Sequence, residues 1–330
     1  MNYSTHKGAG SGSGYNSGTN QDKPFGMAPA VRRVTHETAY EYEQPAECSQ
    51  QICILQPQEG PAMAPGLLRK GQRLLNHSLR IQPNPSTLQT HIDVNGNIVT
   101  HFEMNYPHDH LSVVSQSELE VIPRLHTGHV DELYSPSWDV LASSLAYHAG
   151  AETPVDGQHR FSSKHVVVSE QFRDFGYLDF WPGRSVVSSA YALMSRIHRE
   201  FKYESGSTTI NTTVQEVMAN RKGVCQDFAH VMLSVLRSLG LSARYVSGYM
   251  LTDPPPGQTK LIGVDASHAW VSVWCGDDIG WVDYDPTNDQ LPDLRYVTVA
   301  VGRDYADVPP LRGVVHGGGD HALKVAVTVL

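Results

Sequence analysis

The chain is poor in three features that would each assign it to a class of protein. It has only 4 cysteines among 330 residues, too few for a secreted scaffold built on disulfides. It has no block of lysines and arginines, and its formal net charge is -9. It also lacks an apolar run long enough to cross a bilayer and an N-terminal secretory signal. We therefore expect a cytoplasmic protein without nucleic-acid or membrane partners.

The N-terminal third of the sequence changes from a low-complexity segment to a β-rich pattern. Residues 1–28 are mainly small and polar, so we expect a disordered tail. Residues 29–132 are expected to form a β-rich accessory domain, with a hairpin turn at Asn95-Gly96-Asn97. The predicted strands of this domain are 35–42, 88–94, 98–104 and 112–122.

Residues 133–330 are expected to form a second domain, in which helices precede a run of strands. Apolar residues spaced for one helical face predict a helix over 186–202. Thr213 and Glu216 fit a capping box at the start of a short helix. Residues 225–239 are apolar on almost all sides, which predicts a helix in the middle of a core, ended by Gly240. The predicted strands are 243–251, 268–275, 280–284, 296–302 and 322–330. This order favours an α+β fold over a βαβ fold.

One cysteine lies where a glycine turn gives way to this apolar helix. The first N–H groups of a helix favour negative charge, so Cys225 is placed to act as a thiolate nucleophile. Its backbone N–H is also the natural donor to an oxyanion, whereas the sequence does not identify a second donor. His268 can serve as the base and Asp285 as the acid that orients the imidazole. Asp283 has the same strand parity, so the pattern alone leaves it as an alternative acid.

The ordered segments around these residues resemble the transglutaminase-like superfamily, in particular its bacterial cysteine-protease subset. The matching segments are Gly223-x-Cys225, Leu236-Arg237-x-x-Gly240-x-x-Ala243-Arg244-Tyr245-Val246-x-Gly248-Tyr249, Ser267-His268-Ala269-Trp270 and Asp285-Pro286-Thr287. His36-x-Thr38-x-Tyr40-x-Tyr42 and Asp93-x-x-Gly96-Asn97 are similar to the N-terminal region of the bacterial members. The resemblance runs from Val31 to the C-terminus. It implies a papain-like core with the nucleophile helix on an antiparallel sheet, and a Cys225–His268–Asp285 triad.

Four further residues are candidates for substrate binding. His268 and Trp270 share one strand face, which places the imidazole beside a large aromatic surface. Gln226 follows the nucleophile directly. Arg303 and Asp304 resemble a C-terminal signature of the bacterial subset, and we expect them in a loop beside the cleft, where they would contact a charged substrate. A salt-bridged loop is the alternative for this pair.

Other polar residues have a structural explanation. We expect Asp227 to accept hydrogen bonds from backbone N–H groups at the helix start. For His230, in the same helix, we favour a structural role over a catalytic one. The segment from His316 to His321 contains three glycines between its potential ligands, so we interpret it as a turn and predict no metal site. Cys48, Cys53 and Cys275 are expected to be buried thiols. No cofactor is expected.

The resemblance implies attack of the Cys225 thiolate on an amide or acyl carbonyl, with a thioester intermediate. Transfer to water makes the protein a protease or amidase, and transfer to a primary amine makes it a transglutaminase. We favour hydrolysis of a peptide or other amide bond by analogy with bacterial relatives. A binding or scaffold module remains an alternative from a different class.

Overall fold

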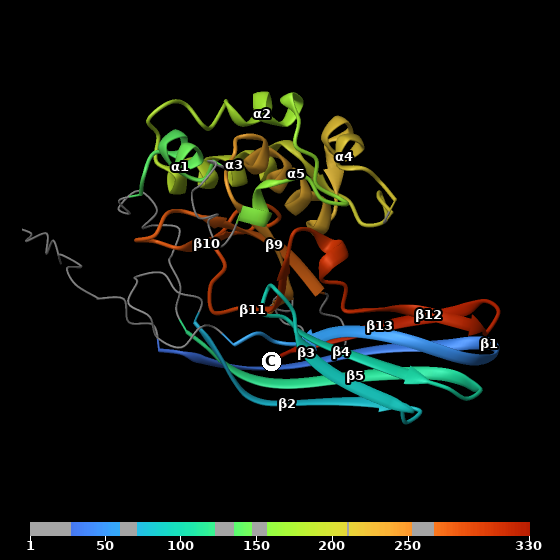
Figure 1. Cartoon of the computed structure of the whole chain (residues 1–330). Helices are drawn as coiled ribbons and strands as arrows, with labels where there is room; N and C mark the ends of the chain where they lie inside the picture. The colour runs from blue at the N-terminus through green and yellow to red at the C-terminus, as the bar shows by residue number, and fades with distance from the viewer. Residues whose placement is uncertain (1–27, 60–70, 123–134, 147–156, 210, 253–266) are drawn as a thin grey trace, which may run out of the picture.

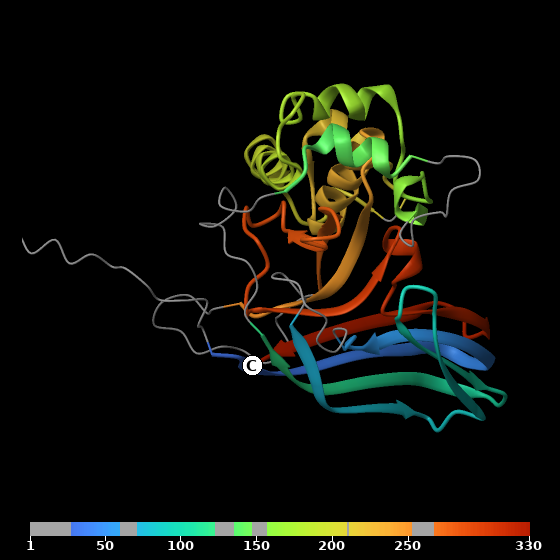
Figure 2. The same ribbon diagram turned by 60° about the vertical axis from the view of Figure 1, so that its left-hand side comes forward.

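The computed structural model describes residues 28–59, 71–122, 135–146, 157–209, 211–252 and 267–330 (Figure 1). The predicted tail at 1–28 therefore lies almost wholly outside the described residues, as does the predicted domain boundary at 132–133. Within the described part, no helix is long and apolar enough to span a membrane. The chain forms an α+β fold, as predicted, with helices above a four-stranded sheet and a larger sheet below (Figures 1 and 2).

The larger sheet is organised by one long strand. β1 (Ala30–Gln56) has 27 residues, and its register shifts between Glu41 and Ala46. The part before the shift pairs with β5 (His108–Val121) and the part after it pairs with β4 (Ile98–Met104). β2 (Gln72–Gln82) and β3 (Thr87–Ile92) complete the order β2-β5-β1-β4-β3. The sheet curves around its own small core of buried side chains, made of Cys53, Leu55, Ile81, Phe102, Met104, Leu111 and Val113.

The two C-terminal strands differ from the prediction in their partners. They were expected in the domain of residues 133–330, but β12 (Leu311–Gly317) and β13 (His321–Val329) both pair antiparallel with β1. Alternation of apolar and polar residues identifies a strand without identifying its partner, because pairing is decided by packing between distant segments. The first and last strands of the described residues, β1 and β13, thus lie in the same sheet (Figure 1).

The smaller sheet carries the helices. Its antiparallel strands are β8 (Ala243–Met250), β9 (Ser267–Trp274), β10 (Trp281–Tyr284) and β11 (Tyr296–Gly302), in the order β10-β9-β8-β11. The helices are α1 (Trp138–Ser144), α2 (Glu170–Gly176), α3 (Val186–Glu200), α4 (Val214–Asn220) and α5 (Cys225–Ser238). Two short 3₁₀ turns, η2 (Gly157–Arg160) and η3 (Tyr305–Asp307), and the parallel pair of β6 (Lys202–Tyr203) and β7 (Lys222–Gly223) complete the fold.

The sequence signals at helix ends are present in the structure. The predicted capping box forms at the start of α4: the Thr213 hydroxyl accepts the Glu216 N–H, and the Glu216 carboxylate accepts the Thr213 N–H. α5 is buried along almost its whole length, as its all-round apolar pattern predicts. Gly240 has a φ of +83° directly after the helix, a conformation that favours glycine.

Buried polar contacts join the two sheets. The Asn97 amide exchanges hydrogen bonds with the backbone of Val301 in β11, at 2.8 and 2.9 Å. The Gln72 amide does the same with Thr298, at 2.6 and 2.9 Å. Since these bonds satisfy otherwise buried backbone groups, they fix the position of the larger sheet against β11. The Asp93-x-x-Gly96-Asn97 motif therefore has a structural role.

The cysteines are all unpaired, and one of them differs from the prediction. Cys53 and Cys275 are buried, as expected, and burial raises the pKa of each thiol to about 12. Cys48 is exposed instead of buried. It lies after the register shift of β1, where strand parity no longer follows the sequence alternation.

Candidate active site

The start of α5 is held by an acid in its first turn. Oδ2 of Asp227 accepts hydrogen bonds from the Val224 N–H at 2.8 Å and from the Thr208 hydroxyl at 2.7 Å. A Cβ at Gly223 would lie only 2.7 Å from the same oxygen, so glycine is required there for this close approach. Asp227 thus accepts a backbone N–H at the helix start, as predicted. Cys225 occupies the first helical position.

β9 and the segment after β10 bring a histidine and a carboxylate together. Nε2 of His268 and Oδ2 of Asp285 are 2.7 Å apart. The Asp285 side chain is fully buried and the His268 side chain is 10% exposed. Burial disfavours the charged imidazole, but the Asp285 carboxylate and then the hydrogen bond to Cys225 outweigh it and raise the His268 pKa to about 10. His268 is therefore an imidazolium at neutral pH.

The acid that binds His268 in the structure is Asp285. Asp283, the alternative, lies in β10 opposite Ser272, whereas the hydrogen bond to His268 comes from Asp285. Burial alone would raise the pKa of the Asp285 carboxyl, but the positive charge and hydrogen bond of His268 lower it. Asp285 is therefore ionised where the imidazolium needs a counter-charge.

Two residues that sequence reasoning missed also bind this carboxylate. The Tyr296 hydroxyl donates to Oδ2 of Asp285 at 2.6 Å, and the Asn288 amide donates to it at 2.7 Å. Oδ1 accepts the backbone N–H of Thr287 at 2.9 Å. The turn-forming Asp-Pro-Thr-Asn sequence could have indicated Asn288. Tyr296 lies eleven residues later in another strand, and no local spacing indicates it.

The three predicted catalytic side chains lie together. Cys225 is half-buried, and its hydrogen bond to the imidazole is one of the causes that raise the His268 pKa. Because Nε2 of His268 binds Asp285, Nδ1 is the ring nitrogen left for the thiol. An imidazolium next to a sulfur at a helix N-terminus stabilises the thiolate form. Chemically, the arrangement can provide a nucleophile, a proton donor and an acid that orients the imidazole.

The four predicted substrate-binding residues are not equivalent. Trp270 is fully buried, with its ring centroid 5.3 Å from that of Tyr296 and 6.0 Å from that of His268. Trp270 therefore packs against the imidazole, as the strand parity predicts, and has no exposed surface for a substrate. Gln226 is half-buried and directly follows Cys225, so it stays a predicted binding residue.

Arg303 and Asp304 form the salt-bridged loop that was the alternative for this pair. The Arg303 guanidinium binds both carboxylate oxygens of Asp307 at 2.9 Å. Asp304 is 1% exposed and accepts the N–H groups of His165 and Ala306, each at 2.8 Å. Buried Arg237 donates to the Arg303 and Ala243 carbonyls, which ties the end of α5 to this loop. The contacts of the pair are structural, and the expected substrate role is not supported by them.

His230 does not join the catalytic residues. Its Nε2 accepts the Tyr305 N–H at 3.2 Å, and its ring stacks on His165 with centroids 5.2 Å apart. Burial lowers the His230 pKa to about 3, so the ring is neutral. In the described residues, no group of three or more His, Cys, Asp or Glu side chains has the arrangement of a metal site. The segment from His316 to His321 joins β12 to β13 as a turn.

Fold and site together define a cysteine-centred α+β protein of the papain-like type, and sequence comparison gives its family. Residues 182–286 match the model of the transglutaminase-like superfamily, and residues 32–120 match that of the bacterial transglutaminase-like N-terminal region. The chain belongs to the transglutaminase-like superfamily, as the motifs predict.

Its relatives include proteins of known and unknown activity. The chain is 40% identical to the uncharacterized protein Rv2569c of Mycobacterium tuberculosis over 302 residues, which cover 90% of this chain and 92% of the relative. It is 33% identical to a protein-glutamine gamma-glutamyltransferase of Pseudomonas aeruginosa over 132 residues, 37% of this chain and 20% of that protein. A crystal structure from Cytophaga hutchinsonii, provisionally described as a cysteine protease, has a TM-score of 0.68 at 19% identity, covering 92% and 91% of the two chains. That similarity shows a common fold.

Proposed function

We propose that the protein is a cysteine-dependent acyl-transfer enzyme that hydrolyses a peptide or another amide bond. The observation that carries the proposal is the position of His268, which binds the buried Asp285 carboxylate through one ring nitrogen and contacts Cys225 with the other. A packed structural thiol needs neither a charged imidazole nor a buried acid behind it. The cost of burying these charges is consistent with a catalytic role.

The reaction follows from these positions. The Cys225 thiolate attacks the carbonyl carbon, and the Cys225 backbone N–H donates to the developing oxyanion. The His268 imidazolium gives its proton to the leaving nitrogen, so that an amine or ammonia departs and a thioester remains. The neutral imidazole then removes a proton from water, which attacks the thioester and releases the carboxylic acid and the thiolate. Asp285 keeps the imidazole in one orientation throughout.

Transfer to a primary amine is the second candidate. It is supported by the 33% identity to a protein-glutamine gamma-glutamyltransferase, which covers 132 residues. The first half-reaction is the same in both cases. The second differs because water needs no binding site of its own, whereas an amine must be bound and water excluded. For this reason we place hydrolysis first and a bound amine acceptor second.

A product analysis tests the proposal. Wild type, Cys225→Ala and the exposed-thiol control Cys48→Ala are incubated with glutamine-containing peptides, with and without a primary amine, and the products are read by mass spectrometry. We expect cleaved or deamidated peptides from wild type and from Cys48→Ala, and none from Cys225→Ala. Amine adducts as the main products would favour the transferase. Unchanged peptides in every sample would favour a binding or scaffold module.

A further inference from the structure

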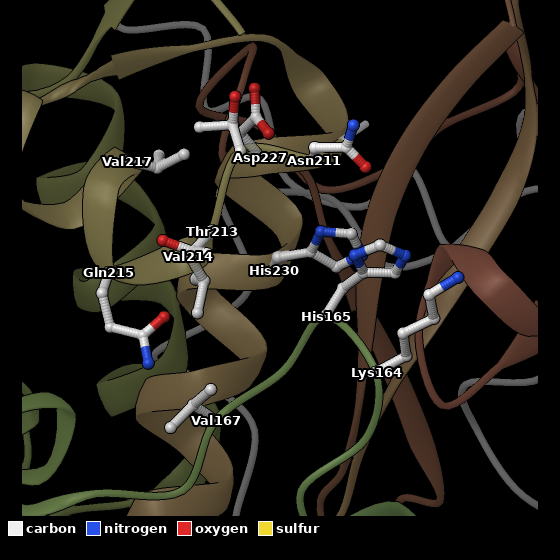
Figure 3. Close-up of a pocket in the computed structure, with 11 residues that line it drawn as sticks. Lys164, His165, Val167, Asn211, Thr213, Val214, Gln215, Val217, Asp227 and His230 are labelled. Atoms are coloured by element: carbon white, nitrogen blue, oxygen red, sulfur yellow. The ribbon is translucent and has the colours of Figure 1, made fainter. Parts of the chain in front are cut away.

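A pocket separate from the triad lies along the nucleophile helix. Its volume is about 380 Å³, and two side chains of α5, Asp227 and His230, form one wall (Figure 3). The other lining residues come from two segments: Lys164, His165 and Val167 before α2, and Asn211, Thr212, Thr213, Val214, Gln215 and Val217 at the start of α4. Successive helical residues turn by about 100°, which directs these two side chains about 200° and about 140° away from Cys225. None of the triad residues lines the pocket. The pocket is therefore on the flank of α5 that faces away from His268.

A buried hydrogen-bond donor faces this pocket. His230 is 4% exposed, and its Nε2 accepts the Tyr305 N–H, so the single proton of the neutral ring is on Nδ1. No residue in the described part of the chain accepts a hydrogen bond from Nδ1. Figure 3 shows the ring, stacked on that of His165, projecting into the space between Asn211 and Lys164. This N–H opens onto the pocket, where a ligand or a water molecule can accept its hydrogen bond.

Two charged side chains line the pocket, Lys164 and Asp227. The exposed ammonium group of Lys164 is on the same side of the pocket as the two imidazole rings (Figure 3). Asp227 adds a carboxylate to the lining, whose Oδ2 accepts two hydrogen bonds at the start of α5, and in Figure 3 it lies on the other side of the His230 ring from Lys164. A ligand that fits these groups places an anionic oxygen acceptor at Lys164 and the His230 N–H, away from Asp227.

The opposite wall of the pocket is aliphatic. Val167, Val214 and Val217 line it, and they lie to one side of the imidazole rings in Figure 3. Val167 is half-buried and offers apolar surface to a short hydrocarbon chain, whereas Val214 and Val217 are buried and form the wall behind it. The pocket therefore combines an anion-binding end with an aliphatic wall.

We propose that this pocket binds a small aliphatic carboxylate, with the carboxylate between His230 and Lys164 and the hydrocarbon chain against the valines. This is a second ligand site, distinct from the site of the acyl-transfer chemistry. Two molecules carry the required group: a free short-chain fatty acid and the C-terminal carboxylate of a peptide ending in an aliphatic residue.

Ligand titration of the full chain tests this site. Sodium butyrate, acetylvaline, n-butylammonium chloride and inorganic phosphate are titrated separately, and the dissociation constants are measured by NMR. The variants are Lys164→Ala, which removes an exposed side chain, and His230→Phe, which removes the donor but keeps a flat ring on His165. Lys324→Ala, an exposed lysine of β13, is the matched control, and circular dichroism checks the fold of each variant.

We expect butyrate, acetylvaline or both to bind with one site per chain, and their relative affinity to identify the source of the carboxylate. Each charge-assisted hydrogen bond that is lost should weaken binding roughly tenfold, in Lys164→Ala and in His230→Phe, with no change in Lys324→Ala. The proposal is overturned by no binding of either carboxylate, by equal affinities in Lys164→Ala and the control, or by tighter binding of n-butylammonium or phosphate.

Discussion

Replacement of Asp285 by asparagine should remove a pH-dependent part of the stability of the protein. The His268 pKa is raised from 6.5 to about 10, chiefly by the Asp285 carboxylate acting against burial. A group whose pKa is raised on folding stabilises the native state fully below its unfolded pKa, and this stabilisation is lost as the pH rises through the folded pKa. With these two pKa values the contribution is roughly 5 kcal/mol at pH 6, roughly 3 kcal/mol at pH 8 and below about 1 kcal/mol at pH 10.

A double-mutant cycle isolates this contribution from other titrating groups. Wild type, Asp285→Asn, His268→Phe and the double variant are unfolded with urea at pH 6, 8 and 10, and the coupling energy is calculated at each pH. The coupling should decrease steadily with pH, because only the imidazolium interacts strongly with the carboxylate. A coupling below about 1 kcal/mol at pH 6, typical of an exposed ion pair, would refute the reasoning. So would a coupling that is constant or increases up to pH 10.

Three further predictions concern the same region. At pH 6 an ordinary thiol with a pKa near 8.5 is only about 0.3% ionised. Iodoacetamide should therefore label Cys225 at least tenfold faster than exposed Cys48, as measured by peptide mapping. Equal labelling rates would contradict an activated thiol. Tyr296→Phe removes one donor to the Asp285 carboxylate while the ring stays packed, and should lower the unfolding free energy by about 1.5–3 kcal/mol; exposed Tyr177→Phe is the control. Gly223→Ala should displace the Asp227 carboxylate, lowering the melting temperature and the rate of peptide turnover together, and an unchanged melting temperature would show that the helix start adapts.

Local signals in the sequence predicted a large part of the fold and of the site. Gly223, Cys225 and the apolar run after them defined the nucleophile helix, because a helix start has a recognisable turn and an unambiguous period. The capping box at Thr213 and the left-handed Gly240 depend on neighbouring residues only, and both are present. The pairing of His268 with Asp285 followed from the family motif, since strand parity alone did not separate Asp285 from Asp283.

The features that were missed depend on contacts between distant segments. β12 and β13 have the alternation of any strand, and their pairing with β1 involves residues far away in the sequence. Tyr296 begins β11 and Asp285 follows β10, which lie at opposite edges of the order β10-β9-β8-β11, so their contact depends on how the whole sheet is assembled. The burial of Trp270 and Asp304 has the same cause. The sequence identified both residues as close to the site, but it did not show that their side chains are buried.

Direct detection of the acyl-enzyme tests the central claim. The protein is mixed with a glutamine-containing peptide, quenched in acid within seconds, and the mass of the intact chain is measured for wild type and for Cys225→Ala. We expect that wild type gains the mass of the acyl group, that hydroxylamine removes it, and that Cys225→Ala gains nothing. The same added mass on Cys225→Ala, or conversion of the peptide by that variant at the wild-type rate, would contradict a reaction through Cys225.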